Sequence, residues 1–153
     1  MHFVHAQVIE LPASEVFAFI SDPENLPRWN YYVIRCTKLD LGPARVGSRY
    51  RLVRKSDTRV FSVTEFKQDQ QLVIRFRAPT PLLEVRLTVE STRSGTRVTD
   101  EWELGGIAGF VAGFAVAPIK RAVVENLGKL KELLETGRTE LQDGRVERYV
   151  SAR

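Results

Sequence analysis

Few side chains in this sequence are of the kinds that bind metals or act as nucleophiles. The 153 residues include one cysteine, Cys36, and two histidines, His2 and His5. A single cysteine excludes an internal disulfide and a thiolate cluster for zinc or iron–sulfur. The sequence also has no glycine-rich phosphate loop and no nucleophile beside a base. We therefore expect no metal and no cofactor.

One acidic residue lies at a position where its pKa is expected to be shifted. Over residues 96–104, Val98, Trp102 and Leu104 share one face of an alternating stretch, and Asp100 lies on that same apolar face. Burying a lone carboxylate is costly, so this side chain should be hydrogen-bonded or have a raised pKa. Asp100 is thus the first candidate for a functional group.

The elements that must position these residues are a sheet and one long helix. Strands are expected over 2–10, 32–39, 48–55, 58–67, 71–78, 82–90 and 96–104. Two short helices begin at Pro12 and after Asp22. Apolar residues at helical spacing between Ile119 and Leu134 predict a long helix that ends at Gly137.

This element order predicts an α+β protein. The strict alternation of residues 82–90 indicates an antiparallel sheet with one buried face. We expect seven curved antiparallel strands to wrap around the long C-terminal helix, with two short helices between the first and second strands. Residues 1–137 are expected to form a single domain, and residues 138–153 a loosely held polar tail.

Short motifs at caps, turns and core positions resemble a known superfamily. They lie at Ile9–Phe17, Ile20–Asp22, Pro27–Trp29, Val46–Tyr50, Ser94–Thr99 and Leu127–Glu135. With the element order, they resemble the START-like or SRPBCC superfamily of polyketide cyclases, aromatases, lipid-transfer domains and the birch-pollen allergen fold. The resemblance implies a helix-grip fold with a deep, mostly apolar cavity between sheet and helix. It therefore implies a small hydrophobic ligand, although a fold alone does not assign an activity.

The resemblance also orients the first strand. It turns the set Phe3, His5, Gln7 and Ile9 toward the cavity, a choice that alternation alone leaves open. His5 and Asp100 then lie on neighbouring strands. One interpretation is a His–carboxylate pair acting as general base, and the other is a structural role in which the two groups, or Asp100 and a loop, are hydrogen-bonded.

Other residues are expected to line the cavity. Tyr50 and Arg54 share the parity of Leu52, and a Tyr and an Arg are supposed to polarise a ligand carbonyl in cyclase members of the superfamily. The alternatives are a core tyrosine and a solvent-exposed arginine. The expected ligand-binding residues are Phe3, His5, Trp29, Tyr50, Leu52, Arg54, Ile74, Phe76, Asp100, Trp102, Phe110 and Phe114.

A glycine-rich segment joins the last strand to the long helix. Gly105, Gly109 and Gly113 recur every fourth residue, with Phe110 and Phe114 between and after them. One hypothesis is a gate over residues 105–117 that covers the cavity mouth. Close packing, membrane contact and dimerisation are the alternatives.

The hydrophobicity and the net charge of the chain limit the classes of function that it can have. The longest uncharged stretch, 104–119, has 16 residues, which is too short for a transmembrane helix, and no signal peptide is evident, so we expect a cytoplasmic protein. The net charge of +4 does not indicate nucleic acid binding. We expect a monomer or homodimer that either binds or binds and transports a small hydrophobic ligand, such as a lipid, polyketide or aromatic metabolite. The alternatives are a cofactor-independent cyclase, dehydratase or aromatase, and a protein-interaction module like the chaperone-activating relatives.

The basic residues are concentrated in the strands. Between Leu41 and Asp100 the chain holds twelve Lys and Arg against six acids, a larger excess than that of the whole chain. Arg49, Arg51, Arg75, Arg77 and Arg86 take the outward parity of their strands. This pattern predicts a solvated outer face with charge pairs across strands, or contact with an anionic partner or membrane surface.

Overall fold

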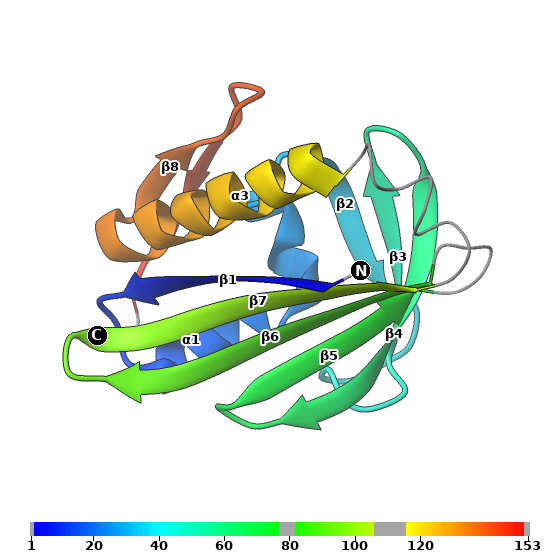
Figure 1. The fold of residues 1–153 in the computed structure, drawn as a ribbon, viewed down its shortest axis with the longest axis horizontal. Coiled ribbons are helices and arrows are strands. Elements are labelled where there is room, and N and C mark those ends of the chain that lie inside the picture. The colour runs from blue at the N-terminus through cyan, green and yellow to red at the C-terminus, as the bar shows by residue number, and fades with distance from the viewer. Residues whose placement is uncertain (1, 77–81, 106–115, 152–153) are drawn as a thin grey trace.

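A computed structural model describes residues 2–76, 82–105 and 116–151 of the chain (Figure 1). Its strands and helices follow the expected order. They are β1 (His2–Ile9), α1 (Ala13–Ile20), the 3-10 helix η1 (Pro23–Arg28), β2 (Val33–Lys38), β3 (Arg49–Arg54), β4 (Thr58–Lys67), β5 (Gln71–Phe76), β6 (Leu82–Thr92), β7 (Gly95–Gly105), α3 (Val116–Thr136), β8 (Arg138–Glu140) and β9 (Val146–Arg148).

β1 to β7 form one antiparallel sheet in the order β1-β7-β6-β5-β4-β3-β2, and α3 lies over one face of it, along β1 and β7 (Figure 1). Sheet burial follows the alternation of the sequence: Leu83, Val85, Leu87 and Val89 of β6 are all buried. Every second residue can face α3 because successive side chains of a strand point to opposite faces. The helix-grip arrangement predicted from the sequence is therefore confirmed.

The buried side chains form two apolar clusters along the groove of the sheet. The Tyr50 cluster contains Phe3, Val33, Cys36, Tyr50, Leu52, Phe61, Val63, Leu72, Ile74, Phe76, Leu83, Val85, Leu104 and Val123. The Phe17 cluster contains Ile9, Leu11, Val16, Phe17, Phe19, Ile20, Trp29, Leu87, Val89, Val98, Leu127, Leu130, Leu133 and Leu134. The first lies where β1 and α3 begin, and the second lies under α1 and the end of α3.

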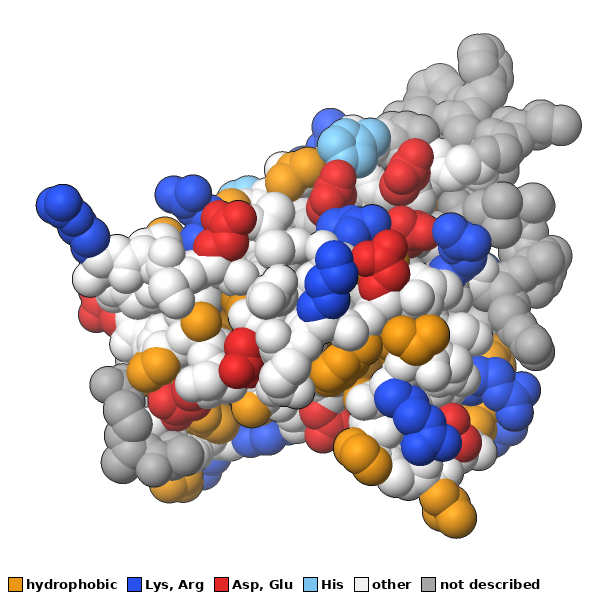
Figure 2. Space-filling view, turned by 90° about the horizontal axis from the view of Figure 1, so that it is seen from below, with side chains coloured by type: hydrophobic (Ala, Val, Ile, Leu, Met, Phe, Trp, Pro, Cys, Tyr) orange, Lys and Arg blue, Asp and Glu red, His pale blue; other side chains and the backbone are white. Residues whose placement is uncertain are grey.

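The outer face of the sheet carries ion pairs across strands. Arg86 lies within ion-pair distance of Glu65, Glu84 and Glu101, and Arg75 donates to Glu84 at 2.7 Å. Figure 2 shows Lys and Arg interspersed with Asp and Glu on this side. The cross-strand charge pairs expected from the sequence are therefore present on the outer face of β4 to β7.

The C-terminal residues differ from the expected loosely held tail. Residues 138–148 contain a hairpin of β8 and β9, and Thr139 and Leu141 are fully or almost fully buried. The turn contains Asp143 and Gly144, and Gly144 has a φ of 89°, which favours glycine. The Asp-Gly pair is a strong hairpin signal that could have predicted this turn from the sequence, although the short, polar segment around it is typical of a tail.

We expect Leu141→Ala to lower the free energy of unfolding by about 2–4 kcal/mol, because it truncates an almost fully buried side chain in the C-terminal hairpin. Val150→Ala is the matched control, since Val150 is 89% exposed and its truncation should change stability by less than about 0.5 kcal/mol. Urea denaturation measures both. Equal stability of the two variants would mean that the hairpin is not part of the cooperative fold.

Candidate functional site

Asp100 lies on the inner face of β7 at the boundary between the two clusters. Val98 belongs to the Phe17 cluster, whereas Trp102 packs against the Tyr50 cluster. His5 is directly opposite Asp100 in the β1–β7 register, so both side chains lie on the same face of the sheet. Two polar residues therefore stand together where the apolar lining changes from one cluster to the other.

α3 supplies a third polar residue at this boundary. Asn126 is only 5% exposed, and it lies between Val123 of the Tyr50 cluster and Leu127 of the Phe17 cluster. Its Oδ1 atom is buried and has no hydrogen-bond partner within the described part of the chain. A buried carbonyl oxygen without a partner is rare in folded proteins and calls for a hydrogen-bond donor.

Two contacts fix the level of Asn126 relative to the sheet. Lys120 Nζ lies 5.7 Å from the centroid of the Phe3 ring, and Lys131 Nζ donates to the Val8 carbonyl at 2.7 Å. The helix therefore runs along β1 in the same direction. Asn126 lies midway between the two lysines and is level with the middle of β1. We call His5, Asp100 and Asn126 the polar seam.

Asp100 has the most perturbed acidity in this seam. The residue is 5% exposed, and its Oδ1 accepts one hydrogen bond, from Trp102 Nε1 at 2.8 Å. Burial raises the pKa of the Asp100 carboxyl from its usual 3.8 to about 7, and the indole hydrogen bond opposes this rise only in part. Near neutral pH the group can therefore donate a hydrogen bond or accept one.

His5 does not form the expected pair with Asp100. The two are opposite in register, but the imidazole makes no hydrogen bond with any residue that the structure describes, and the carboxylate is bonded to Trp102. The ring of His5 is half-buried on the inner face. It thus remains a separate polar group beside Asp100.

Most of the predicted apolar ligand residues come together in the Tyr50 cluster. Phe3 stacks on Trp102, with ring centroids 5.7 Å apart, and Tyr50 stacks on Phe61 at 5.1 Å. The cluster also contains Leu52, Ile74 and Phe76. These residues come from β1, β3, β4, β5 and β7, which the curved sheet brings around one end of α3.

Tyr50 adds a hydroxyl to this apolar wall. The residue is 1% exposed, and its hydroxyl makes no hydrogen bond among the described residues. Burial raises the pKa of Tyr50 above its usual value, with negative charge nearby acting in the same direction. The hydroxyl therefore stays protonated and can donate to a ligand oxygen.

Two other predicted residues, Trp29 and Arg54, do not join this cluster. Trp29 is buried in the Phe17 cluster. Arg54 lies at the β3–β4 turn, where it donates to both carboxylate oxygens of Asp57 at 2.6 Å. It is therefore a solvent-side arginine, the alternative to a cavity-lining one. Phe110 and Phe114, with most of the proposed gate over 105–117, lie outside the described residues.

Cys36 and the acidic side chains outside the polar seam add neither a reactive thiol nor a metal site among the described residues. Burial raises the pKa of the Cys36 thiol to about 12, which keeps it protonated and unreactive. Among residues 2–76, 82–105 and 116–151, no His, Cys, Asp and Glu side chains gather into a group that could hold a metal ion. None of the helices described there is both long and apolar enough to cross a membrane.

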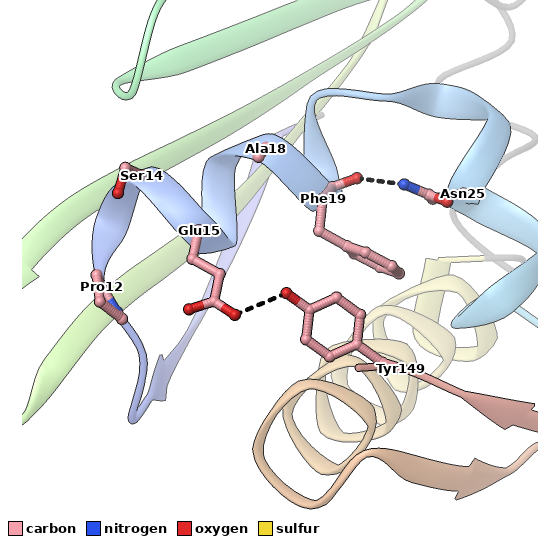
Figure 3. A pocket seen from close by; sticks show the side chains of 7 residues that line it. All are labelled: Pro12, Ser14, Glu15, Ala18, Phe19, Asn25 and Tyr149. Carbon is pink, nitrogen blue, oxygen red and sulfur yellow. Dashed lines mark hydrogen bonds between the residues drawn. The ribbon is translucent and has the colours of Figure 1, made fainter. Parts of the chain in front are cut away.

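A groove of about 540 Å³ lies away from the polar seam, between α1, η1 and the chain after β9 (Figure 3). Its polar groups already have partners: Glu15 accepts hydrogen bonds from the hydroxyls of Tyr149 and Ser151. Tyr149 also packs edge-on against Phe19 at 5.4 Å. These contacts hold the C-terminal segment against α1, so we assign the groove a structural role.

Residues 1–135 match the polyketide cyclase/dehydrase and lipid transport family. The chain therefore belongs to this family, and the resemblance found in the sequence is confirmed. No curated protein sequence matches it significantly.

Solved structures share the fold. Protein MLL2253 from Mesorhizobium loti has a TM-score of 0.73 at 16% identity, over 89% of this chain and 98% of that one. The Aha1 dimer from Colwellia psychrerythraea has a TM-score of 0.70 at 17% identity, over 90% and 98%. DynU16, from the dynemicin biosynthetic locus, has a TM-score of 0.71 at 21% identity, over 89% of this chain but only 48% of its own. At these identities the likeness concerns the fold alone.

The raised pKa of Asp100 predicts that the protein loses stability as pH rises. Because the folded state holds the proton more tightly than the unfolded chain, ionising the group between about pH 4 and 7 lowers the free energy of unfolding by about 1.4 kcal/mol per pH unit. Asp100→Asn remains neutral. Relative to wild type, it should gain about 3 kcal/mol between pH 5 and 8 in urea denaturation.

Asp57→Asn is the control, because the pKa of this carboxyl is shifted in the opposite direction: Arg54 holds the pKa of Asp57 below its usual value, so the group is ionised throughout pH 5 to 8. This variant should gain no stability, relative to wild type, over the same interval. Parallel pH profiles for wild type and Asp100→Asn would contradict the burial of an ionisable carboxyl at this position.

Proposed function

We propose that this member of the family binds a small, largely apolar molecule that carries at least one hydroxyl or carbonyl group. The ligand lies against the Tyr50 cluster, with its polar group toward the polar seam. The observation that carries the proposal is the unpartnered Oδ1 of the buried Asn126, level with Asp100 and His5 on the facing strands.

The two parts of the site support different parts of the ligand. The rings of Phe3, Trp102 and Tyr50 offer stacking surfaces to a planar aromatic or polyketide-like skeleton. Asn126 Oδ1 accepts a hydrogen bond, the Tyr50 hydroxyl donates one, and Asp100 does either near neutral pH. A ligand without polar groups would leave these atoms unpaired, and that lowers its affinity.

This division predicts a preference that simple probes can measure. The protein should bind 2-naphthol about tenfold more tightly than naphthalene, because only the phenol can donate to the seam. Asn126→Leu removes the unpartnered acceptor, so it should reduce this preference while naphthalene binding is kept. Quenching of tryptophan fluorescence reports binding.

Gln142→Ala is the matched control, since Gln142 is exposed in the C-terminal hairpin and should leave both affinities unchanged. Failure of both probes to bind would overturn the proposed class of ligand. Native mass spectrometry of the protein as purified gives an independent test by revealing a co-purifying lipid or metabolite.

A second function is favoured by the acidity of Asp100. A carboxyl with a pKa of about 7 is well matched to proton transfer near neutral pH. In a dehydratase, the ionised Asp100 would take a proton from the carbon next to a ligand carbonyl, and the Tyr50 hydroxyl would stabilise the negative charge that develops on the carbonyl oxygen. The protonated Asp100 would then return the proton to the leaving β-hydroxyl, which departs as water. In a cyclase, the carbanion would instead attack a second carbonyl of the ligand, and the oxygen of that carbonyl would take the proton from Asp100. This role requires no cofactor.

The two functions differ in what Asp100→Asn does. A carrier should bind 2-naphthol with nearly unchanged affinity after this substitution, and so should a cyclase. Only an enzyme should lose a reaction: for a dehydratase, the dehydration of a β-hydroxy ketone by wild type should fall at least about a hundredfold in the variant. Absence of turnover by wild type would leave the carrier as the function.

A further inference from the structure

The loop between β2 and β3 exposes aliphatic side chains. Leu41 is 91% exposed and Val46 60%, and Leu39 also reaches solvent. Hydrophobic side chains stand beside Lys and Arg toward the lower right of Figure 2, which views the molecule from the side opposite α3. A group of exposed aliphatic residues on one loop is unlike scattered surface leucines and marks an interaction surface.

The loop holds these side chains in fixed turns. Ser48 N donates to the Arg45 carbonyl at 3.0 Å, and Gly47 N donates to Val63 of β4 at 2.9 Å, so Val46 lies within a turn tied to the sheet. Lys38 Nζ bonds the Asp40 carboxylate at 2.7 Å and the Leu41 carbonyl at 3.3 Å. The exposed aliphatic side chains therefore project from an ordered loop.

Arginines surround the loop on the outer face of the sheet. Leu39 N donates to the Arg49 carbonyl, and Arg51 is paired with Thr37, which places Leu39, Arg49 and Arg51 on neighbouring outward positions. Together with Arg45, these two arginines are exposed and form no ion pair with an acid that the structure describes. The nearby Asp40 is already bonded to Lys38.

This half of the outer face contrasts with the other half. On β4 to β7, Arg75 and Arg86 are matched by Glu65, Glu84 and Glu101. Arg49 and Arg51 of β3 have no such partner among the described residues, whereas Arg54 at the end of β3 is paired with Asp57. The local positive charge is thus free to meet an anionic surface, and aliphatic side chains lie at its edge.

We propose that Leu39, Leu41, Val46, Arg45, Arg49 and Arg51, the loop patch, dock the protein on an anionic lipid surface. Leu41 and Val46 enter the boundary of the acyl chains, and the arginines contact lipid phosphates. The aliphatic character favours lipid over nucleic acid, because proteins hold exposed bases by stacking on aromatic rings. This docking is independent of what the internal site binds.

Vesicle co-sedimentation tests the proposal. Wild type should bind vesicles of phosphatidylcholine with 30 mol% phosphatidylglycerol and should not bind pure phosphatidylcholine. Binding should fall as NaCl is raised, because salt screens exposed charges. The double variant Leu41→Ser/Val46→Ser should bind at least about tenfold more weakly. Substituting Arg45, Arg49 and Arg51 with Gln should cost about fivefold for each arginine.

Matched controls come from other exposed positions. Val124→Ser/Val150→Ser removes two exposed valines from α3 and from the chain after β9, and Arg93→Gln/Arg97→Gln removes exposed arginines at the β6–β7 turn. Both controls should bind vesicles like wild type. Equal losses in controls and patch variants would overturn the proposal, and so would equal binding to neutral and anionic vesicles.

A second measurement follows the loop itself. Leu41→Trp places an indole at the tip, and its emission should shift to shorter wavelength when anionic vesicles are added. An unchanged spectrum would overturn insertion. A dimer that the Leu41→Ser/Val46→Ser variant dissociates would assign the patch to a second copy instead. Binding of an RNA oligonucleotide that is lost only in the arginine variants would likewise overturn lipid docking.

Discussion

The register of β1 on β7 is the constraint on which the internal site depends. These strands are separated by about ninety residues in sequence, yet their pairing sets Phe3 opposite Trp102 and His5 opposite Asp100. Because side chains alternate between the faces of a strand, a shift of one residue would turn Phe3 and His5 toward solvent. The same pairing gives α3 its support, since Lys120 and Lys131 reach β1 near its two ends.

Much of the fold follows from local patterns, but the orientation of β1 does not. Its outward set includes Val4, which is 50% exposed, while the polar His5 and Gln7 face inward. Hydrophobic alternation would favour the opposite choice, and only the family resemblance gave the right one. The inward position of polar side chains on β1 has a physical reason: His5 lies opposite Asp100, at the boundary between the two apolar clusters.

Asn126 shows a different limit of prediction from sequence. It lies three residues after Val123 and four before Leu130, on the apolar stripe that predicted α3, so its position carried a signal. A helix pattern identifies such a residue as buried, but the lack of a hydrogen-bond partner for its oxygen depends on tertiary packing. Arg54 is the converse case: its strand parity suggested the interior, and the short β3–β4 turn brings Asp57 within its reach.

The contact between Lys131 and the Val8 carbonyl has a consequence for the free edge of the sheet. β1 is a terminal strand, and its outer side would offer backbone groups to a strand of another molecule. The ammonium occupies the Val8 carbonyl, and Glu135 accepts a hydrogen bond from the amide of Glu10 at 2.8 Å. The last turns of α3 thus occupy backbone groups at the C-terminal end of this edge, and they make that end a poor template for an added strand.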